Sequence, residues 1–245
     1  MRVISECWVI VHLLSSKARE IEHVCCKIKA GSDLRCLPID ERLGGDEQRM
    51  SEMEKDGEVL HDLGTSVWRR WKHALSEKDD PFRTLMLASA GLEGGGYARM
   101  VVLRGVEAQE RQLEFHTDVR SPKVEQLQAD PHATLLVWDP AERLQVRAEG
   151  RIVLFAEGTD LARERFEALS ESARKTYGTQ TAAGLPLDSP DALGASLPED
   201  AARRNFVVAQ LTVERIDWLR LKPEGQRRAE IVYRPTGAIQ RWIAP

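Results

Sequence analysis

The sequence predicts a mainly β protein, an antiparallel barrel with a few peripheral helices. Runs of alternating apolar and polar residues recur along most of the chain and are separated by short turns. No strand–helix–strand pattern repeats, which argues against a doubly wound nucleotide-binding fold. Consecutive strands joined by tight turns favour an antiparallel sheet, and closure into a barrel would remove its exposed edges.

The first segment of the chain, residues 1–56, differs from the remainder. It shows no sustained periodicity and contains all four cysteines. We expect a poorly ordered leader here, followed by one domain over 57–245. Met50 and Met53 stand just before the first convincing helix, so one interpretation is that residues 1–49 lie upstream of the natural start. The alternative is a genuine disordered leader.

Bulk composition excludes several functional classes. The net charge of -4 argues against general nucleic-acid binding, which needs a basic surface. No apolar run is long enough to span a membrane. The cysteines lack a CxxC spacing and the six histidines show no paired ligand spacing, so we expect no metal site. The cysteine distribution also favours a cytoplasmic location.

The elements of the predicted domain follow in order, beginning with an amphipathic helix over 60–75. Its apolar residues fall on one face at helical spacing, namely Leu60, Leu63, Val67, Trp68, Trp71, Ala74 and Leu75. Trp68 and Trp71 are therefore expected in the core or at a subunit interface. Strands are expected over 82–90, 98–106, 111–117, 132–138, 143–155, 206–217, 229–234 and 239–243.

Two further helices and one long loop interrupt the strands. A short helix fits 122–129, because Ser121 suits the N-cap and Pro122 the first helical position. Another helix fits 159–173, and its arginines are expected to form a solvated face. Residues 175–204 are rich in small and polar residues and are expected to form a loop, and long loops within a domain are usually functional or mobile.

The strand over 99–104 is apolar and carries an arginine at each end. Alternation places Arg99, Val101 and Leu103 on one face and Met100, Val102 and Arg104 on the other. Arginines often flank a buried strand only to keep its ends solvated. The predicted helix start at Ser121 favours anion binding instead, because backbone N–H groups and the positive end of the helix dipole attract anions there.

A phosphate at this helix start would meet Ser121, Lys123 and the strand arginines together. Gln145 opens a neighbouring strand and has an amide able to bond a polar heterocycle through both ends. The pattern therefore indicates a phosphorylated ligand held without a metal.

In their order along the chain, these motifs resemble the pyridoxamine 5'-phosphate oxidase-like family of FMN-binding split β-barrels, and more narrowly its Alr4036-type branch. The resemblance covers roughly residues 58–245. The motifs that carry it are Arg99-Met-Val-Val-Leu-Arg104, Phe115-His-Thr117, Ser121-Pro-Lys123, Glu142-Arg-Leu-Gln-Val146 with Gly150, Tyr177-Gly-Thr-Gln-Thr181, Ile216-Asp-Trp-Leu-Arg-Leu221, Gln226-Arg-Arg228 and Trp242-Ile-Ala-Pro245. It implies a split barrel that dimerises, holds FMN between two identical subunits and acts on a small molecule.

The resemblance also implies which residues bind FMN. Ser121 and Lys123 would hold the phosphate, and Gln145 would face the flavin ring. Gln180 would come from the long loop, often the loop of the other subunit. The full set is Arg99, Met100, Val101, Val102, Leu103, Arg104, His116, Thr117, Ser121, Lys123, Gln145, Gln180, Trp218 and Arg228. Trp218 lies one place before the tryptophan position of the oxidase, which here is Leu219.

Several departures from the oxidase pattern bear on the substrate. Pro122 replaces an arginine and removes one phosphate donor, while Arg104 replaces a lysine. Glu230 occupies or adjoins an arginine position, and the Tyr-x3-Arg-x3-Ser pattern that grips the substrate phosphate is absent from 159–177. FMN binding is therefore better supported than binding of pyridoxamine 5'-phosphate.

The functional prediction is an FMN-dependent oxidoreductase in which the flavin performs the redox chemistry. No residue stands out as a catalytic acid or base. Two alternatives stay open at this point. One is a non-catalytic FMN-binding carrier or sensor, and the other is a flavin reductase that uses NAD(P)H.

Overall fold

The computed structural model describes residues 8–12, 23–27, 59–189, 191–192 and 194–245. The chain divides into two units, Met1–Gly57 and Glu58–Pro245. In the first unit, β1 (Trp8–His12) and β2 (His23–Lys27) pair antiparallel. The leader predicted for 1–56 and the start at Met50 or Met53 fall mainly outside the described residues, so they stay predictions.

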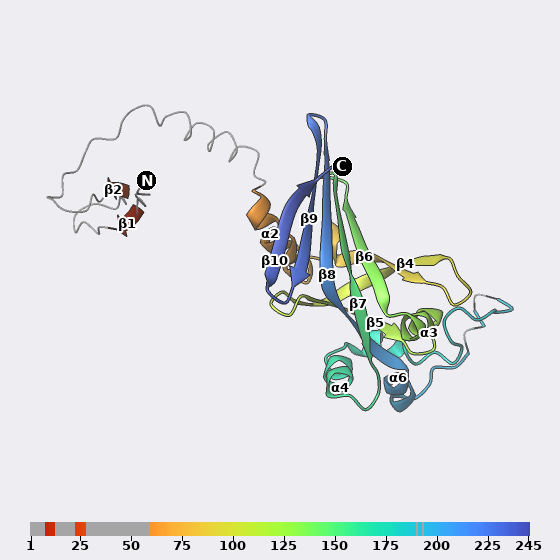
Figure 1. The fold of residues 1–245 in the computed structure, drawn as a ribbon. Coiled ribbons are helices and arrows are strands. Elements are labelled where there is room, and N and C mark those ends of the chain that lie inside the picture. The colour runs from red at the N-terminus through yellow and green to blue at the C-terminus, as the bar shows by residue number, and fades with distance from the viewer. Residues whose placement is uncertain (1–7, 13–22, 28–58, 190, 193) are drawn as a thin grey trace. The chain divides into compact units, whose positions relative to one another are not determined.

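The second unit contains the eight predicted strands, with bounds that differ by a few residues (Figure 1). The strands are β3 (Thr84–Ala90), β4 (Gly96–Glu107), β5 (Gln112–Asp118), β6 (His132–Asp139), β7 (Leu144–Phe155), β8 (Phe206–Lys222), β9 (Gly225–Arg234) and β10 (Gly237–Ile243). The helices are α2 (Leu60–Ala74), the 3-10 turn η2 (Pro81–Arg83), α3 (Pro122–Ala129), α4 (Asp160–Glu167), α5 (Glu171–Lys175) and α6 (Glu199–Asn205).

All strand pairs in this unit are antiparallel, and six strands close into a barrel. The strand order is β10-β9-β8-β5-β4-β3-β6-β7, and an additional pairing of β7 with β8 closes the ring. The 17-residue length of β8 makes this possible, because one edge of β8 pairs with β7, while the other edge pairs first with β5 and then with β9. The predicted fold class, a mainly β antiparallel split barrel with peripheral helices, is confirmed.

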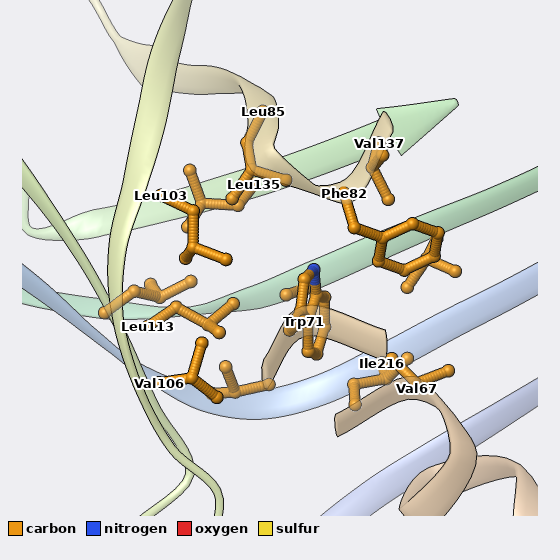
Figure 2. Close-up of a cluster of buried hydrophobic side chains, with 14 of the residues drawn as sticks. Val67, Trp71, Phe82, Leu85, Leu103, Val106, Leu113, Leu135, Val137 and Ile216 are labelled. Atoms are coloured by element: carbon orange, nitrogen blue, oxygen red, sulfur yellow. The ribbon is translucent and has the colours of Figure 1, made fainter. Parts of the chain in front are cut away.

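Helix α2 closes the barrel core with the face that its sequence predicts. Trp68 and Trp71 are 6% and 1% exposed, and their rings meet edge to face at 5.0 Å. Figure 2 shows Trp71 lying among apolar side chains from the strands and beside Phe82. Trp68 is anchored further by its indole N–H, which donates to the Tyr233 hydroxyl at 2.7 Å.

The segment between β7 and β8 differs from the predicted helix and loop. The expected helix over 159–173 is two helices, because Ser170 accepts a hydrogen bond from the Ala173 amide and starts α5 as a new N-cap. The expected loop over 175–204 contains α6 at its end. Figure 1 shows α4 and α6 at the end of the unit where β8 begins. There Phe166 and Phe206 form part of a second buried cluster.

Gly150 allows β7 and β8 to close the barrel. The register shifts between Glu149 and Gly150, so that Glu214 is an extra residue on β8. A Cβ atom at Gly150 would lie 2.0 Å from the backbone oxygen of Thr212. Only glycine therefore fits this crossing of the two strands.

Candidate functional site

Four side chains from three elements form a cluster at one end of the barrel, which we call the cation cluster: Arg99, Thr117, Ser121 and Lys123. The Lys123 ammonium donates to the Ser121 hydroxyl at 2.6 Å and to the Thr117 hydroxyl at 3.2 Å. Ser121 precedes α3 at the N-cap position, as predicted, but its side chain makes no capping hydrogen bond to the helix. The hydroxyl is used to hold Lys123 instead.

A second layer of buried polar groups holds Arg99 beside this cluster. Its guanidinium donates to the Ser89 hydroxyl at 2.7 Å and also to the side-chain oxygen of Gln126. Ser89 and Gln126 are 7% and 6% exposed, and Ser89 donates to Gln126 at 3.0 Å. Arg99 is therefore fixed at the end of β4 by bonds to β3 and α3.

The electrostatics of the cation cluster favour an anion. Burial lowers the pKa of Lys123, and the nearby charge of Arg99 lowers it further, while Asp118 acts in the opposite direction. Burial also lowers the pKa of Arg99. Two partly buried cations that repel each other, next to two hydroxyl groups and the N-terminus of α3, form a donor set that suits a phosphate.

A groove of about 830 Å³ lies next to this cluster, with Ser89 in its lining. Small residues form part of its lining, among them Ala88, Ala133 and Gly150, and Glu149 and Arg215 are among its charged residues. Ser89 therefore belongs both to the groove and to the bonds that hold Arg99.

The strand segment 99–104 shows the alternation that its sequence predicts. Val101 and Leu103 are buried in the core, at 7% and 1% exposed, so their side chains face away from solvent. Met100 and Val102 are 62% and 37% exposed on the outer face of β4. A ligand on this face would meet the side chains of Met100 and Val102, and only the backbone of the two buried residues.

Arg104 is the extra residue of a β-bulge. Leu103 pairs with Phe115 and Gly105 pairs with Glu114, so the side chain of Arg104 is left outside the regular alternation. No hydrogen bond or ion pair joins Arg104 to another residue of the described ranges. Burial raises the pKa of Tyr177 to about 12, and the charge of Arg104 acts on that pKa in the opposite direction.

His116 lies on the other side of β5 from Thr117 and is turned away from the cation cluster. Its ring contacts Glu114 at 3.2 Å and packs edge to face on Phe206 at 4.9 Å. Glu114 is also bound by Arg165 of α4 at 2.9 Å. The predicted solvated helix face is therefore wrong for Arg165, because its guanidinium reaches a buried carboxylate on a distant strand.

Gln180 lies in the loop that follows α5, and Arg120 ties this loop to the start of α3. The Arg120 guanidinium donates to the backbone oxygens of Thr179 and Gln180 at 2.9 and 3.4 Å, and it also binds Asp118. The same loop passes Pro122, since a Cβ built at Gly184 would lie 3.3 Å from the Pro122 ring. The loop therefore covers the start of α3 within one chain.

A second group of predicted residues meets across β7, β8 and β9. Gln145 pairs with Leu219, and Leu219 pairs with Arg228, so these three residues form one row on the outer face. Trp218 points the other way, into the core, where it is 3% exposed. Its ring centroid lies 6.2 Å from that of Trp242, in an edge-to-face arrangement. The side chain on the face of Gln145 is therefore that of Leu219.

The two groups are connected by two different paths around the barrel. Thr117 pairs with Val207 near the start of β8, whereas Gln145 pairs with Leu219 near its end. The strand from Val207 to Leu219 is about 40 Å long at the rise of a β-strand. Across β3 and β6, however, the register places Arg99 only three strand spacings, about 15 Å, from Ala148, which lies three residues from Gln145.

Comparison with known proteins gives this arrangement a family context. Residues 65–156 match the family model described as pyridoxamine 5'-phosphate oxidase, FMN-binding domain. A pyridoxine/pyridoxamine 5'-phosphate oxidase from Burkholderia lata is 41% identical over 98 residues, which are 40% of this chain and 44% of that protein. The corresponding protein of Burkholderia ambifaria is 45% identical over 98 residues, which are again 40% of this chain and 44% of that protein. The resemblance to the pyridoxamine 5'-phosphate oxidase-like family is confirmed.

Solved structures extend the similarity beyond the segment matched in sequence. A pyridoxamine 5'-phosphate oxidase-related, FMN binding protein from Nostoc punctiforme has a TM-score of 0.62 and 26% identity. The match covers 77% of this chain and all of that one. PhzG from Burkholderia lata has a TM-score of 0.59 and 16% identity over 74% of this chain and 92% of its own, which shows the shared fold. The chain aligns with less than half the length of the curated oxidases.

Two remaining properties of the described residues concern metal binding and membrane insertion. Within them, no group of three or more His, Cys, Asp or Glu side chains is placed to hold a metal ion. None of the helices described is long and apolar enough to cross a membrane.

Three arginines of this region were not predicted from the sequence to belong to the site. Arg120 and Arg165 act through partners that are distant in sequence, so no local pattern marks them. Arg147 shares the outer face of β7 with Gln145 and binds the buried Asp217 at 2.7 Å. Because Arg147 lies two residues after Gln145, alternation along the strand could have placed both side chains on the same face.

Proposed function

We propose that this protein binds FMN and acts as an FMN-dependent oxidoreductase of the oxidase family. The observation that carries the proposal is the cation cluster, in which Lys123, Arg99 and two hydroxyl groups converge at the start of α3. The family match over residues 65–156 supports FMN as the ligand, because that model describes an FMN-binding domain.

The residues present fit the cofactor. Lys123, Arg99, Ser121 and Thr117 would hold its phosphate, and Gln145 would bond the polar part of the ring. When bound, FMN supplies the capacity to accept a hydride from a small-molecule substrate. The chain then serves to bind, to orient and to limit access, which is consistent with the absence of an evident acid or base among the predicted residues.

A homodimer is part of this proposal. The family that this chain resembles holds FMN between two identical subunits, so a second copy would supply part of the site. The exposed apolar side chains of Met100, Val102 and Trp138 on the outer strands support burial of this face against a partner. A cytoplasmic location is proposed from the distribution of cysteines alone.

A non-catalytic FMN carrier or sensor is the second candidate, and one observation favours it over turnover of vitamin B6 phosphates. The arginines of α4 and α5 already bind groups of this chain: Arg163 binds Asp160, Arg165 binds Glu114, and Arg174 binds Glu199 and two backbone oxygens. None of these three is left unpaired for a second phosphate.

The test is a visible spectrum of the purified protein, a titration with FMN, and an assay of peroxide release. Oxidation of pyridoxamine 5'-phosphate consumes dioxygen and water and releases the aldehyde, ammonia and hydrogen peroxide. We expect a yellow protein that takes up one FMN per protomer. A colourless protein that binds no added FMN contradicts the proposal. A yellow protein inert to this amine leaves FMN binding intact and favours another substrate or the carrier.

The affinity for FMN is expected to fall as the pH rises from neutral toward 10.5, the ordinary pKa of a lysine. Burial and Arg99 lower the pKa of Lys123 in the free protein, whereas a bound phosphate dianion raises it again. Binding is therefore coupled to proton uptake above the lowered pKa, and each further pH unit weakens it by up to about tenfold.

The matched control for this pH dependence is Lys123→Met, measured by fluorescence titration over the same pH range. Ionisation of the flavin itself affects both proteins equally, so the difference between the two curves isolates Lys123. Parallel curves for the two proteins would show that Lys123 does not contact the phosphate.

A further inference from the structure

One row of residues crosses seven strands on the outer face of the second unit, and it changes character midway. The row, given by the strand register, is Met100, Met86, Leu136, Arg147, Asp217, Glu230 and Arg241. Its first three members are apolar and at least partly exposed, and its last four are charged. Arg147 is the first charged residue after the apolar strip.

Buried carboxylates hold the charged half of this row in place. Asp217 is 0% exposed and accepts hydrogen bonds from Arg147 at 2.7 Å and from Arg228 at 2.8 Å. Burial alone would raise the pKa of Asp217, but the two guanidinium groups hold that pKa below its ordinary value. The single charge of Asp217 is shared by the two guanidinium groups, and Glu149 also approaches Arg147.

Arg147 retains capacity for another partner. Its side chain is 32% exposed, and its Nε atom is buried without a hydrogen-bond partner among the described residues. Glu149, its other neighbour, lies at 3.5 Å. The guanidinium thus has a fixed position, a partly exposed side chain and one donor without a partner among the described residues.

This arrangement matches the two ends of a flavin ring system. The dimethylbenzene end is apolar, whereas the pyrimidine end carries hydrogen-bond acceptors and gains negative charge on reduction. The strip from Met100 to Leu136 spans two strand spacings, about 10 Å, and Arg147 lies one further spacing beyond Leu136. Gln145, the residue proposed to bond the ring, lies two positions from Arg147 on the same face of β7.

We infer that Arg147, held by Asp217 at the end of the apolar strip, contacts the pyrimidine end of the bound flavin and raises its midpoint potential. The inference rests on the proposed function, since it assumes that FMN binds at this face. A fixed positive charge stabilises the reduced, negatively charged flavin more than the oxidised one, and the surrounding low dielectric strengthens this preference.

The experiment measures the midpoint potential of the FMN-loaded protein by equilibration with a reference dye, in the wild type and in three variants. We expect Arg147→Met to lower the two-electron reduction equilibrium constant about tenfold, which corresponds to about 30 mV. Arg147→Lys is expected to recover most of this loss, because it keeps the charge. Arg241→Met is the matched control, since Arg241 binds the buried Glu230 at the far end of the same row.

The outcomes separate this inference from the proposed function. A wild type that binds no FMN overturns both. FMN-loaded proteins in which Arg147→Met leaves the potential unchanged, or shifts it no more than Arg241→Met does, overturn this inference alone. Thermal unfolding of each variant checks that the fold persists, and the Lys variant keeps the test valid if the Met variant does not fold.

Discussion

Replacing Arg99 and Lys123 together by alanine is expected to weaken FMN binding about a thousandfold. Hydrogen bonds to charged groups contribute about 1.5–3 kcal/mol each, so the loss of both cations removes about 4 kcal/mol of binding free energy. Both side chains reach the same point from different elements, β4 and α3, and each single replacement leaves the other cation in place. Isothermal titration of the apo protein with FMN measures the change.

The control removes the same two kinds of charge elsewhere. Arg69 and Lys72 lie on the exposed face of α2, so Arg69→Ala with Lys72→Ala changes the net charge equally and is expected to leave the affinity unchanged. An equal loss in both double variants would mean that long-range attraction, not a local contact, drives binding. Retained affinity in the Arg99 and Lys123 variant would refute the phosphate assignment.

Titration with riboflavin, which lacks the phosphate, sharpens this test. If the cation cluster binds the phosphate, the wild type should prefer FMN to riboflavin strongly, and the double variant should lose that preference. A defect that affects both ligands equally points to a change in fold. Circular dichroism of each variant supplies the independent check.

Local signals in the sequence predicted the parts of this site that depend on local rules. Ser121 and Pro122 mark the start of α3, and that helix spans the residues expected of it. Alternation placed Met100 and Val102 on one face of β4 and Val101 on the other, and the structure shows the first face exposed and the second buried. These features follow from neighbours in sequence, so one sequence is enough to find them.

Features that depend on distant contacts were not predictable in the same way. The partner of Arg165 is Glu114 on another strand, and nothing near Arg165 in sequence indicates it. Ser170 begins α5 as its N-cap, yet serine also occurs inside helices, so its position alone did not mark the break between α4 and α5. The bulge at Glu214 could not be predicted either, because the register shift exists only once β7 and β8 pair.

The direction of Trp218 illustrates how one residue of offset matters. In a strand, neighbouring side chains point to opposite faces, so a shift by one position exchanges core and surface. Trp218 occupies the core face together with Ile216, while Leu219 lies between Gln145 and Arg228. The resemblance places the tryptophan position of the oxidase at Leu219, whereas the structure buries Trp218 in the core.

Trp71→Ala is expected to destabilise the protein by about 3–5 kcal/mol, which is a large share of the 5–15 kcal/mol typical of a folded domain. Trp71 is 1% exposed and packs on Trp68 and on Phe82, so its removal leaves a cavity between α2 and the barrel (Figure 2). Urea denaturation followed by circular dichroism measures the shift of the midpoint at constant slope.

Two matched variants show whether the loss comes from packing. The Trp71 indole N–H is buried without a partner among the described residues, so Trp71→Phe removes an unpaired donor together with part of the ring. Because an unsatisfied buried donor costs about 1–3 kcal/mol, this variant is expected to lose far less stability than Trp71→Ala. Trp242→Ala removes the same side chain from a position that is 43% exposed and is expected to cost less than half as much. Equal losses for Trp71→Ala and Trp242→Ala would show that α2 does not close the core.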